Sequence, residues 1–427
     1  MKPQRLPSLA MHRPIATAIA LLVSLMLMAP SQPDGRPGDR HALVILVEGI
    51  SADILAEVDT PHIDAIVATG AFSLGYVGGE QGHSTESPTI SAVGYNHMLT
   101  GVWSNKHNVW TNDIHAPNYR HWNIFRLAAE QRPDLSTALY SSWTENRTHL
   151  LGEGREEAGT FLLDISYDGF ERDTLSFPHD EQGLFIGDVD QHVAERAAES
   201  ITENGPNLSW VYLWYPDATG HREGENAVHR ASVRAADEQV GLIMEAVRER
   251  ERRFDEDWLV IVTTDHGRRL PVGRDHGGQS YREREIWYAV NTHHVNSYFR
   301  RTHPPITSIF PTIARHLSLD IPTALNNELE GTALIGEVSI STPAATINRV
   351  RRQITVQWVP WEEEGQVDVY LAATNAFARG EADTYHHLAT VPVREGEAVI
   401  DVGEFPSAFY KVAIEARHNT IGTWVEY

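Results

Sequence analysis

Short, unbroken apolar runs alternate with helix-like stretches from about residue 40 to residue 335. The run Ala42–Val47 has no polar residue at alternate positions, which is typical of a strand buried on both faces of a parallel sheet. Further apolar runs cover 208–215 and 257–265, and helical patterns cover 60–70, 190–205 and 228–250. The order of these runs predicts an α/β domain with a mostly parallel central sheet and helices on both faces.

One of the predicted helices carries explicit boundary signals. Thr60 stands in the N-cap position, Pro61 in the first turn and Gly70 at the end. Each residue type suits its place. The Thr hydroxyl can accept a hydrogen bond from a free backbone amide of the first turn, and Pro has no backbone N–H that would be left unpaired there. Gly is favoured at the end of a helix because it tolerates the backbone conformations found there.

The pattern changes near residue 341, where period-two alternation replaces the helical spacing. An all-β sandwich is therefore expected over 341–427. Its segment Ile354–Trp361 resembles the second strand of fibronectin type III domains, with Trp358 as the core tryptophan. Its segment Phe405–Trp424 resembles the late hairpin of that family, with Tyr410 in the tyrosine-corner position. We expect this module to be a spacer or docking domain. The predicted strands are Ile354–Trp361, Gln366–Thr374, Glu397–Gly403 and Phe409–His418.

The first residues have the composition of a cleaved secretory signal. Basic residues precede the apolar run Ile15–Ala29, and a segment rich in Pro, Gly and Asp follows it. The run is shorter than the roughly 20 apolar residues that span a membrane, although an uncleaved anchor is the alternative. We therefore expect a signal peptide over 1–31, a linker over 32–40, a catalytic domain over 41–336, a secreted or periplasmic protein, and no stable membrane span after cleavage.

Charge and cysteine content exclude several classes of protein. The net charge is -23, which disfavours binding to nucleic acid duplexes or anionic membranes. The chain has no cysteine, so disulfides, thiolate metal sites and lipoprotein anchoring are excluded. Positive charge comes almost entirely from arginine, since the only lysines are Lys2, Lys106 and Lys411.

Acidic residues follow three of the predicted strands. Glu48, Asp217 and Asp265 each stand just after an apolar run. Because ligands of open α/β sheets bind at the carboxyl ends of the strands, these three acids are candidate functional residues.

Histidines accompany the acids in three short clusters. DATGH places Asp217 and His221 four residues apart, TTDHG joins Asp265 to His266, and RDHGG puts His276 in a glycine-rich loop. Carboxylates and imidazoles are the ligands of Zn²⁺ and related ions where thiolates are absent. Each acid alone is as easily a turn residue or helix cap, so the prediction of a two-metal site rests on their joint placement.

A nucleophile for such a site is offered by the segment 88–101. Its hydroxyl candidates are Thr89, Ser91 and Thr100, and chemistry alone does not choose among them. Ser91 is also a candidate N-cap of the helix that follows, a position that favours an anionic substrate group.

The segments VILVEGISADIL, PTISAVGYNHMLTGVWSNKHNVWTN, YPDATGH, TTDHG, DHGG and FPTIARHL resemble the alkaline phosphatase superfamily, and most of all its type I phosphodiesterase and nucleotide pyrophosphatase branch. The resemblance implies a secreted phosphoesterase that hydrolyses small phosphate mono- or diesters through a phosphoseryl intermediate on Ser91. Asn112 corresponds to the asparagine that hydrogen-bonds a phosphoryl oxygen.

The resemblance also implies how two metal ions, most plausibly Zn²⁺, are held. Asp217, His221 and His276 would bind one ion, and Glu48, Ser91, Asp265 and His266 the other. The family has aspartate where this chain has Glu48. The longer side chain implies a retracted strand end, a different ion such as Mn²⁺ or Ca²⁺, or a weakened site.

Other activities compete with this interpretation. A sulfatase would need proline and arginine after Ser91, and both are missing. A phosphonate-ester hydrolase or a phosphomutase would share the metal frame, and a non-catalytic metal-binding or adhesion protein could retain the fold. No sequence feature indicates the oligomeric state. Four side chains close to the motifs in sequence are candidates for substrate contacts: Trp110, Arg120, Arg222 and Arg268.

Overall fold

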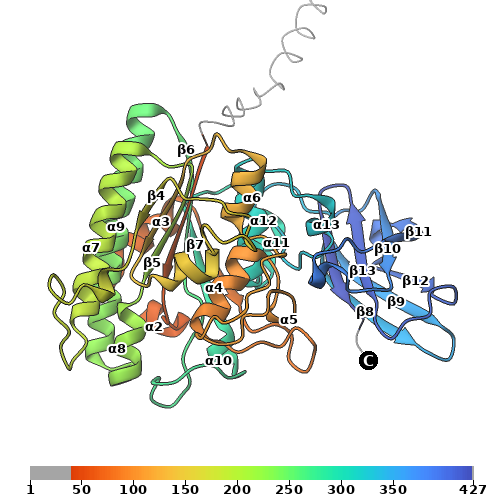
Figure 1. Cartoon of the computed structure of the whole chain (residues 1–427), viewed down its shortest axis with the longest axis horizontal. Helices are drawn as coiled ribbons and strands as arrows, with labels where there is room; N and C mark the ends of the chain where they lie inside the picture. Colours follow the sequence, from red (N-terminus) through yellow and green to blue (C-terminus); the bar gives the residue numbers. More distant parts are fainter. Residues whose placement is uncertain (1–39, 426–427) are drawn as a thin grey trace, which may run out of the picture. The chain divides into compact units, whose positions relative to one another are not determined.

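The computed structural model describes residues 40–425, and its first part is built on one seven-stranded sheet. The strand order is β2-β7-β6-β1-β5-β3-β4 (Figure 1). Strands β6, β1, β5, β3 and β4 run parallel, β7 pairs antiparallel with both β6 and β2, and β7 is therefore the one strand of this sheet that runs against the other six. The predicted mostly parallel sheet is therefore confirmed. The strands are β1 (Arg40–Val47), β2 (Ala71–Tyr76), β3 (Thr137–Ser141), β4 (Ile165–Tyr167), β5 (Leu208–Leu213), β6 (Asp257–Thr263) and β7 (Glu285–Val290).

Helices cover both faces of this sheet, as the sequence predicts. On one face lie α2 (Ala52–Glu57), α3 (Pro61–Thr69), α7 (Phe185–Asn204) and α9 (Ala227–Phe254). On the other lie α4 (Ser91–Thr100), α6 (Ile124–Gln131), α11 (Ser297–Arg301), α12 (Ile309–His316) and α13 (Thr323–Asn326). The short helices α5 (Ser104–His107) and α10 (Tyr281–Arg284) and the helix α8 (Tyr215–Glu223) lie in connections.

Strand β1 shows why its sequence lacks polar alternation. Ala42, Val44 and Leu46 pack into the core on the α4 side, whereas Leu43, Ile45 and Val47 pack into the core on the α7 side. Both faces of the strand are buried, so every position from Ala42 to Val47 is apolar, and Glu48 ends this apolar run.

Two helix starts differ from the prediction. Thr60 precedes α3 but its side chain makes no cap hydrogen bond, because the Asp237 carboxylate of α9 accepts from the amides of His62 (3.1 Å) and Ile63 (2.8 Å) instead. Ser91 is the first residue of α4 and Ile90 holds the N-cap position. In both cases a partner distant in sequence or a one-residue shift replaces the expected local cap.

The second part is an all-β module whose seven strands form sheets of four and three. Strand β8 begins one residue before the expected boundary, and β8 and β11 were not among the predicted strands. Strand β14 lies in the segment whose resemblance implied a late hairpin. A single apolar core joins the two sheets and includes Trp358 and Tyr410, as expected of a sandwich. The strands are β8 (Ile340–Asn348), β9 (Gln353–Pro360), β10 (Gln366–Ala372), β11 (His386–Pro392), β12 (Glu397–Asp401), β13 (Lys411–Ala416) and β14 (Thr420–Trp424).

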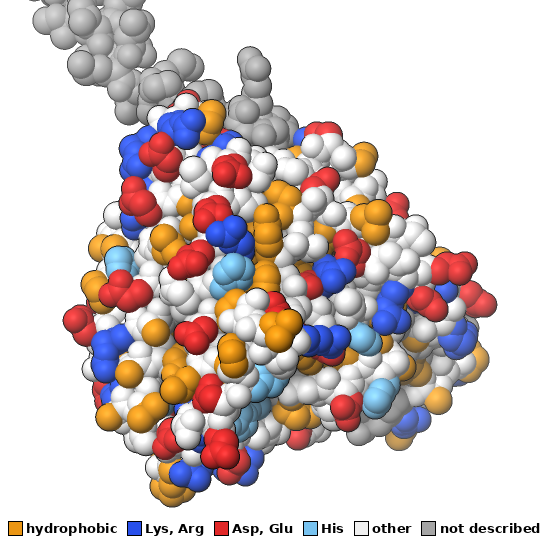
Figure 2. Space-filling view, turned by 60° about the vertical axis from the view of Figure 1, so that its left-hand side comes forward, with side chains coloured by type: hydrophobic (Ala, Val, Ile, Leu, Met, Phe, Trp, Pro, Cys, Tyr) orange, Lys and Arg blue, Asp and Glu red, His pale blue; other side chains and the backbone are white. Residues whose placement is uncertain are grey.

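The surface agrees with the charge composition. Figure 2 shows acidic side chains scattered over the visible face and interspersed with basic ones. Lys106 and Lys411 are both buried, so the exposed cations among residues 40–425 are arginines. The predicted signal peptide and nearly all of the predicted linker lie outside the described residues, and within residues 40–425 no helix is long and apolar enough to cross a membrane.

Candidate active site

The three acids predicted from the strand ends meet at one edge of the sheet. Strands β6, β1 and β5 are neighbours, so the segments that follow them converge. Glu48 follows β1 directly and Asp265 lies two residues beyond β6. The predicted strand 208–215 ends at Leu213, and Asp217 lies in the first turn of α8, one helical turn before His221. The helix starts early because Pro216 is suited to its first turn.

Helix α8 is held in place by a buried carboxylate of the neighbouring helix. Asp190 in α7 accepts hydrogen bonds from the amides of Trp214 (3.0 Å) and Tyr215 (2.6 Å) and from the Ser142 hydroxyl. Burial raises the pKa of Asp190 to about 7, although these three hydrogen bonds oppose the shift. Asp190 thereby fixes the N-terminus from which Asp217 and His221 project.

One group of candidate ligands consists of Asp217, His221 and His276. The Nε2 atoms of the two histidines are 2.9 Å apart, and they lie 3.3 and 3.7 Å from the carboxylate oxygens of Asp217. Thr89 fixes the His276 loop, since its carbonyl pairs with His276 Nδ1 at 2.8 Å and its hydroxyl accepts from the amide of Gly277 at 3.0 Å. The hydrogen bond to Asp217 raises the pKa of His221, whereas burial lowers that of His276.

A second group consists of Glu48, Asp217 and His266, with Asp265 beside it. Asp217 thus belongs to both groups. Glu48 is anchored by the Tyr212 hydroxyl, which donates to its Oε2 atom, and by a side-chain hydrogen bond with Ser91. Burial and the charges of the two aspartates raise the pKa of Glu48 well above its usual range, against those hydrogen bonds.

A glycine makes this crowding possible. Gly49 has φ of +68°, and a Cβ atom there would come within 2.5 Å of Asp217 Oδ1. The residue after Glu48 must therefore be glycine both for its backbone conformation and for the close approach of Asp217.

Arg268 is the buried cation of the site. Its Nη1 group donates to Asp217 Oδ1, and its other nitrogens donate to the carbonyls of Gly273 and Arg274 in the loop that leads to His276. Burial would raise the pKa of Asp217, but the hydrogen bond from His221 and the charge of Arg268 hold it well below its usual range. Arg268 is completely buried and occupied by these partners, so it is not placed to contact substrate.

Ser91 and Asn112 line a cavity of about 240 Å³ together with Glu48, Asp217 and His221. The other hydroxyl candidates have structural roles, since Thr89 holds the His276 loop and the Thr100 hydroxyl bonds back to Asn96 O within α4. Of the three hydroxyl candidates, only Ser91 faces the cavity.

Other predicted contacts lie elsewhere, and several lining residues were not predicted. Trp110, Arg120 and Arg222 do not line the cavity, and Arg120 packs against Gly380 of the β-module. The cavity is instead completed by four aromatic residues that come from different elements: Tyr95 of α4, Tyr212 of β5, and Trp143 and Trp214, which follow β3 and β5.

The donor set fits divalent metal ions. Asp265 Oδ2 and His266 Nε2 are buried and have no hydrogen-bond partner in the described part of the chain. No Lys or Arg pairs with Glu48 or Asp265 within residues 40–425, although both are fully enclosed. A cluster of oxygen and nitrogen donors with unpaired buried atoms suits Zn²⁺ or a similar ion.

The mostly parallel sheet and the carboxylate and imidazole cluster at its carboxyl edge define an alkaline phosphatase-like α/β protein. The chain belongs to the type I phosphodiesterase/nucleotide pyrophosphatase family, whose model matches residues 42–270.

Similar proteins include human ectonucleotide pyrophosphatase/phosphodiesterase family member 7, which is 22% identical over 267 residues, or 59% of this chain and 53% of the relative. A 2,3-bisphosphoglycerate-independent phosphoglycerate mutase of Natronomonas pharaonis is 24% identical over 209 residues, or 47% of this chain and 38% of the mutase. The chain therefore spans about half or less of the length of these relatives.

Among solved structures, a Bacteroides thetaiotaomicron protein described as a sulfatase superposes with a TM-score of 0.51 at 11% identity, covering 86% of each chain. At that identity the likeness shows the fold alone.

Proposed function

We propose that this protein is a metal-dependent phosphoesterase that hydrolyses small phosphate mono- or diesters, with Ser91 as the nucleophile. The observation that carries the proposal is that Ser91, Asn112 and the candidate ligands Glu48, Asp217 and His221 line one cavity. Family membership supports the reaction class.

Ser91 is placed to attack an anionic group. It begins the ten-residue helix α4, so the backbone amides of the first turn and the helix dipole favour a phosphate nearby. Asn112 Oδ1 accepts from the amide of Ala92 at 3.0 Å. Because this bond uses the amide oxygen, the Asn112 Nδ2 group is left to donate to a phosphoryl oxygen.

The proposed ligand sets are those that the family resemblance implies. Asp217, His221 and His276 would hold one ion, and Glu48, Ser91, Asp265 and His266 the other. Zn²⁺ suits the nitrogen and oxygen donors, and Mn²⁺ or Ca²⁺ suits the site with Glu48. When bound, the ions lower the pKa of a coordinated hydroxyl and neutralise charge on the phosphoryl oxygens.

In the proposed reaction the Ser91 Oγ atom forms a bond to phosphorus while the bond to the ester oxygen breaks. The Ser91 hydroxyl proton is released and the departing alcohol gains one. A water molecule then cleaves the phosphoseryl ester, which returns the serine hydroxyl and releases phosphate or a phosphomonoester. Asn112 steadies the same phosphoryl oxygen in both steps.

The test is hydrolysis of bis(p-nitrophenyl) phosphate and p-nitrophenyl phosphate after chelation, with Zn²⁺, Mn²⁺ or Ca²⁺ returned separately. We expect Zn²⁺ to restore turnover and Ser91→Ala to lower kcat/KM by roughly 10³-fold or more. Ser87→Ala is the matched control, because the buried Ser87 hydroxyl bonds only to the carbonyl of Thr85.

Other outcomes identify the alternatives. Absence of turnover with every ion, in a protein that still binds metal, would show a non-catalytic metal-binding protein. Faster hydrolysis of p-nitrophenyl sulfate than of either phosphate would indicate a sulfatase. Full activity in Ser91→Ala would leave the reaction class intact and overturn the nucleophile.

We also propose that the β-module is fibronectin type III-like and that the chain is exported. The seven-stranded sandwich and the Tyr410 hydroxyl, which donates to Phe405 O at 2.7 Å, support the first proposal. The apolar run Ile15–Ala29 supports the second. N-terminal sequencing of the mature protein after expression with its leader tests export.

A further inference from the structure

Five buried charged side chains form one network between the two parts of the chain. Lys411 Nζ donates to Glu328 Oε1 at 2.6 Å and to Asp383 Oδ2 at 2.9 Å. Lys106 Nζ donates to the carbonyl of Glu328 at 2.7 Å and lies 3.2 Å from Glu330 Oε1. Buried charges of this kind persist only where each one is paired, so the network fixes the relative positions of its members.

The network crosses from the β-module to the catalytic domain. Lys411 begins β13 and Asp383 precedes β11, whereas Lys106 lies in α5 and the two glutamates follow α13. The contact is continued by backbone, since the amide of Gly422 in β14 donates to Leu329 O at 2.9 Å. The expected spacer is therefore packed directly on the catalytic domain.

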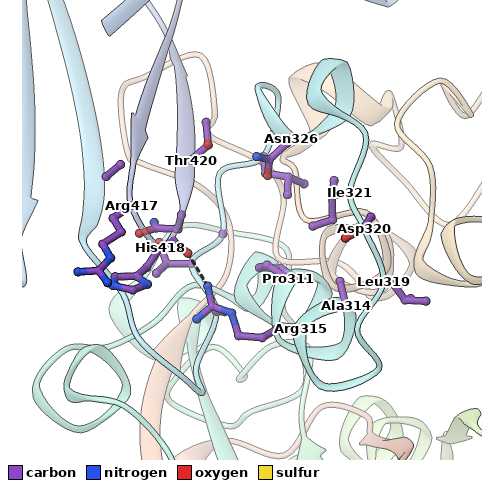
Figure 3. Close-up of a pocket in the computed structure, with 16 residues that line it drawn as sticks. Pro311, Ala314, Arg315, Leu319, Asp320, Ile321, Asn326, Arg417, His418 and Thr420 are labelled. Atoms are coloured by element: carbon purple, nitrogen blue, oxygen red, sulfur yellow. Dashed lines mark hydrogen bonds between the residues drawn. The ribbon is translucent and has the colours of Figure 1, made fainter. Parts of the chain in front are cut away.

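A second clamp closes the same junction beside a cavity of about 340 Å³ (Figure 3). Arg315 of α12 donates through Nη2 to His418 O at 2.8 Å, in the turn between β13 and β14. Its Nη1 group donates to the carbonyls of Ile335 and Glu337, which join the two parts of the chain. The module is thus held at two separate places.

Lys106 stands at one end of the loop that carries Asn112. The loop is closed at its base by Asn118, whose amide donates to His107 O at 2.8 Å and whose side chain donates to Lys106 O at 3.1 Å. Movement of Lys106 would therefore move the base of the loop.

The other end of the loop also touches the module. The ring of His121 packs on Phe377, with centroids 4.7 Å apart, and Arg120 packs against Gly380. One end of the Asn112 loop is therefore held by the charged network, to which the β-module contributes Lys411 and Asp383. The other end packs directly on Phe377 and Gly380 of the β-module.

We propose that the β-module positions the Asn112 loop of the active site, with Lys411 as the positioning residue that acts through Glu328 and Lys106. The inference rests on the proposed function only in giving Asn112 its role in phosphoryl binding. The module holds the loop base, the loop base sets where Asn112 meets Ala92, and that contact places the amide group beside Ser91.

The test compares Lys411→Met with Lys411→Arg and with Val356→Ala. Lys411→Met removes the charge, Lys411→Arg keeps it, and Val356→Ala weakens the module's buried core without touching the network. Hydrogen exchange of the segment 108–120 is the first readout. We expect exchange there to rise about tenfold in Lys411→Met and to stay near wild type in the other two variants.

Kinetics and metal binding give the second readout. We expect Lys411→Met to lower kcat/KM for a phosphodiester about tenfold while Zn²⁺ affinity is unchanged, and Lys411→Arg to restore most of the loss. If Lys411→Met fails to fold, Glu328→Gln breaks the same link with an isosteric side chain.

Two results would overturn the inference, namely loop exchange in Lys411→Met equal to that in Val356→Ala, or an equal loss of kcat/KM in both. Failure of the proposed function is distinguishable, because a wild-type protein without phosphoesterase activity still gives the exchange result.

Discussion

The junction and the sheet edge each hold a buried cluster of charge, and the two clusters are built in opposite ways. At the junction, the carboxylates of Glu328, Glu330 and Asp383 each lie beside Lys106 or Lys411. At the sheet edge, only Asp217 has a guanidinium partner, Arg268. Around that pair, Asp265 Oδ2 and His266 Nε2 lie 3.2 Å apart, are buried, and have no hydrogen-bond partner in the described part of the chain. Glu328 Oε2 at the junction also makes no hydrogen bond there, but it lies 3.8 Å from the ammonium group of Lys106.

The difference separates a cluster suited to holding two elements together from one suited to binding a cation. At the junction three carboxylates share two ammonium groups, so most of the buried negative charge is compensated inside the network and the cluster can hold two elements together. A buried carboxylate without a cationic partner lowers the stability of the fold, and the binding of a cation removes this loss. Charge balance, more than burial or residue type, therefore marks the sheet edge as the place for a ligand.

Removing the cation from each cluster gives the largest effect. Arg268→Met and Lys411→Met should each lower the free energy of unfolding by about 3–5 kcal/mol, because a carboxylate is left buried without its partner. Added Zn²⁺ should recover more stability in Arg268→Met, where it replaces the lost charge at Asp217, than in Lys411→Met. Urea unfolding with and without Zn²⁺ measures both.

The exposed residue Arg379, close to the junction, supplies the control Arg379→Met, which should stay within about 0.5 kcal/mol of wild type. An equal response of Arg268→Met and Lys411→Met to Zn²⁺ would remove the distinction between the clusters.

Lowering the pH should reduce the free energy of unfolding through His107, a buried histidine of α5 close to the junction. Burial lowers the pKa of His107 to about 3, below its unfolded value of about 6.5. The unfolded state then binds more protons between those values, so the stability that His107 contributes is present above about pH 6.5 and is lost as the pH falls toward 3. The loss should reach roughly 4 kcal/mol.

The variant His107→Asn retains an acceptor for the amide of Val109 and should flatten this part of the stability profile. His115→Asn changes an exposed histidine at the tip of the same loop and should leave the profile unchanged. Unfolding measured from pH 7 to pH 4 distinguishes them, and an unchanged slope in His107→Asn would contradict the prediction.

Shortening Glu48 tests whether the sheet edge is built around glutamate. Glu48→Asp should weaken the binding of Zn²⁺ about 10- to 100-fold, because the shorter carboxylate withdraws from Tyr212 and Ser91. Competition with a chromogenic chelator gives the affinity, with the exposed Glu57→Asp as the control. Unchanged affinity with higher activity would show instead that the site tolerates the residue usual in the family.

Salt should have the smallest effect and should act on neither cluster. The net charge of -23 is spread over the surface, and 1 M KCl shortens the screening length from about 10 Å to about 3 Å. The melting temperature should rise by a few degrees, since self-repulsion falls. Calorimetry at increasing KCl concentrations should show the same rise in melting temperature for wild type and Lys411→Met. A different rise in the two proteins would show that the charges of the junction are exposed to salt.

The sheet and the grouping of acids and histidines at its carboxyl edge could be predicted because the signals are local. An apolar run that ends in Glu48, or a strand followed by DHG, contains its own evidence. The same reasoning extended the strand before Asp217 to Tyr215, because the helix that begins there is stabilised by Asp190 from a different element.

What the sequence could not supply depends on contacts between distant segments. Arg268 was a candidate for substrate binding, and only the fold shows its pairing with Asp217, 51 residues away. Strand β11 was missed because it lies largely at the surface and its apolar alternation is weak. The lysines gave no pattern at all, since Lys106 and Lys411 are brought together by Glu328 and the Trp424 ring, which are distant from Lys106 in sequence.

Lys106 and Lys411 are the lysines of the region 40–425, and both are buried. Reagents that modify primary amines should therefore not react with this region while it is folded. An acylating or biotinylating ester can reach either amine only while the junction is open. The rate at which those two residues are labelled therefore measures how often the junction opens. The same property means that amine coupling would attach the native protein through its N-terminal region and leave the sheet edge free.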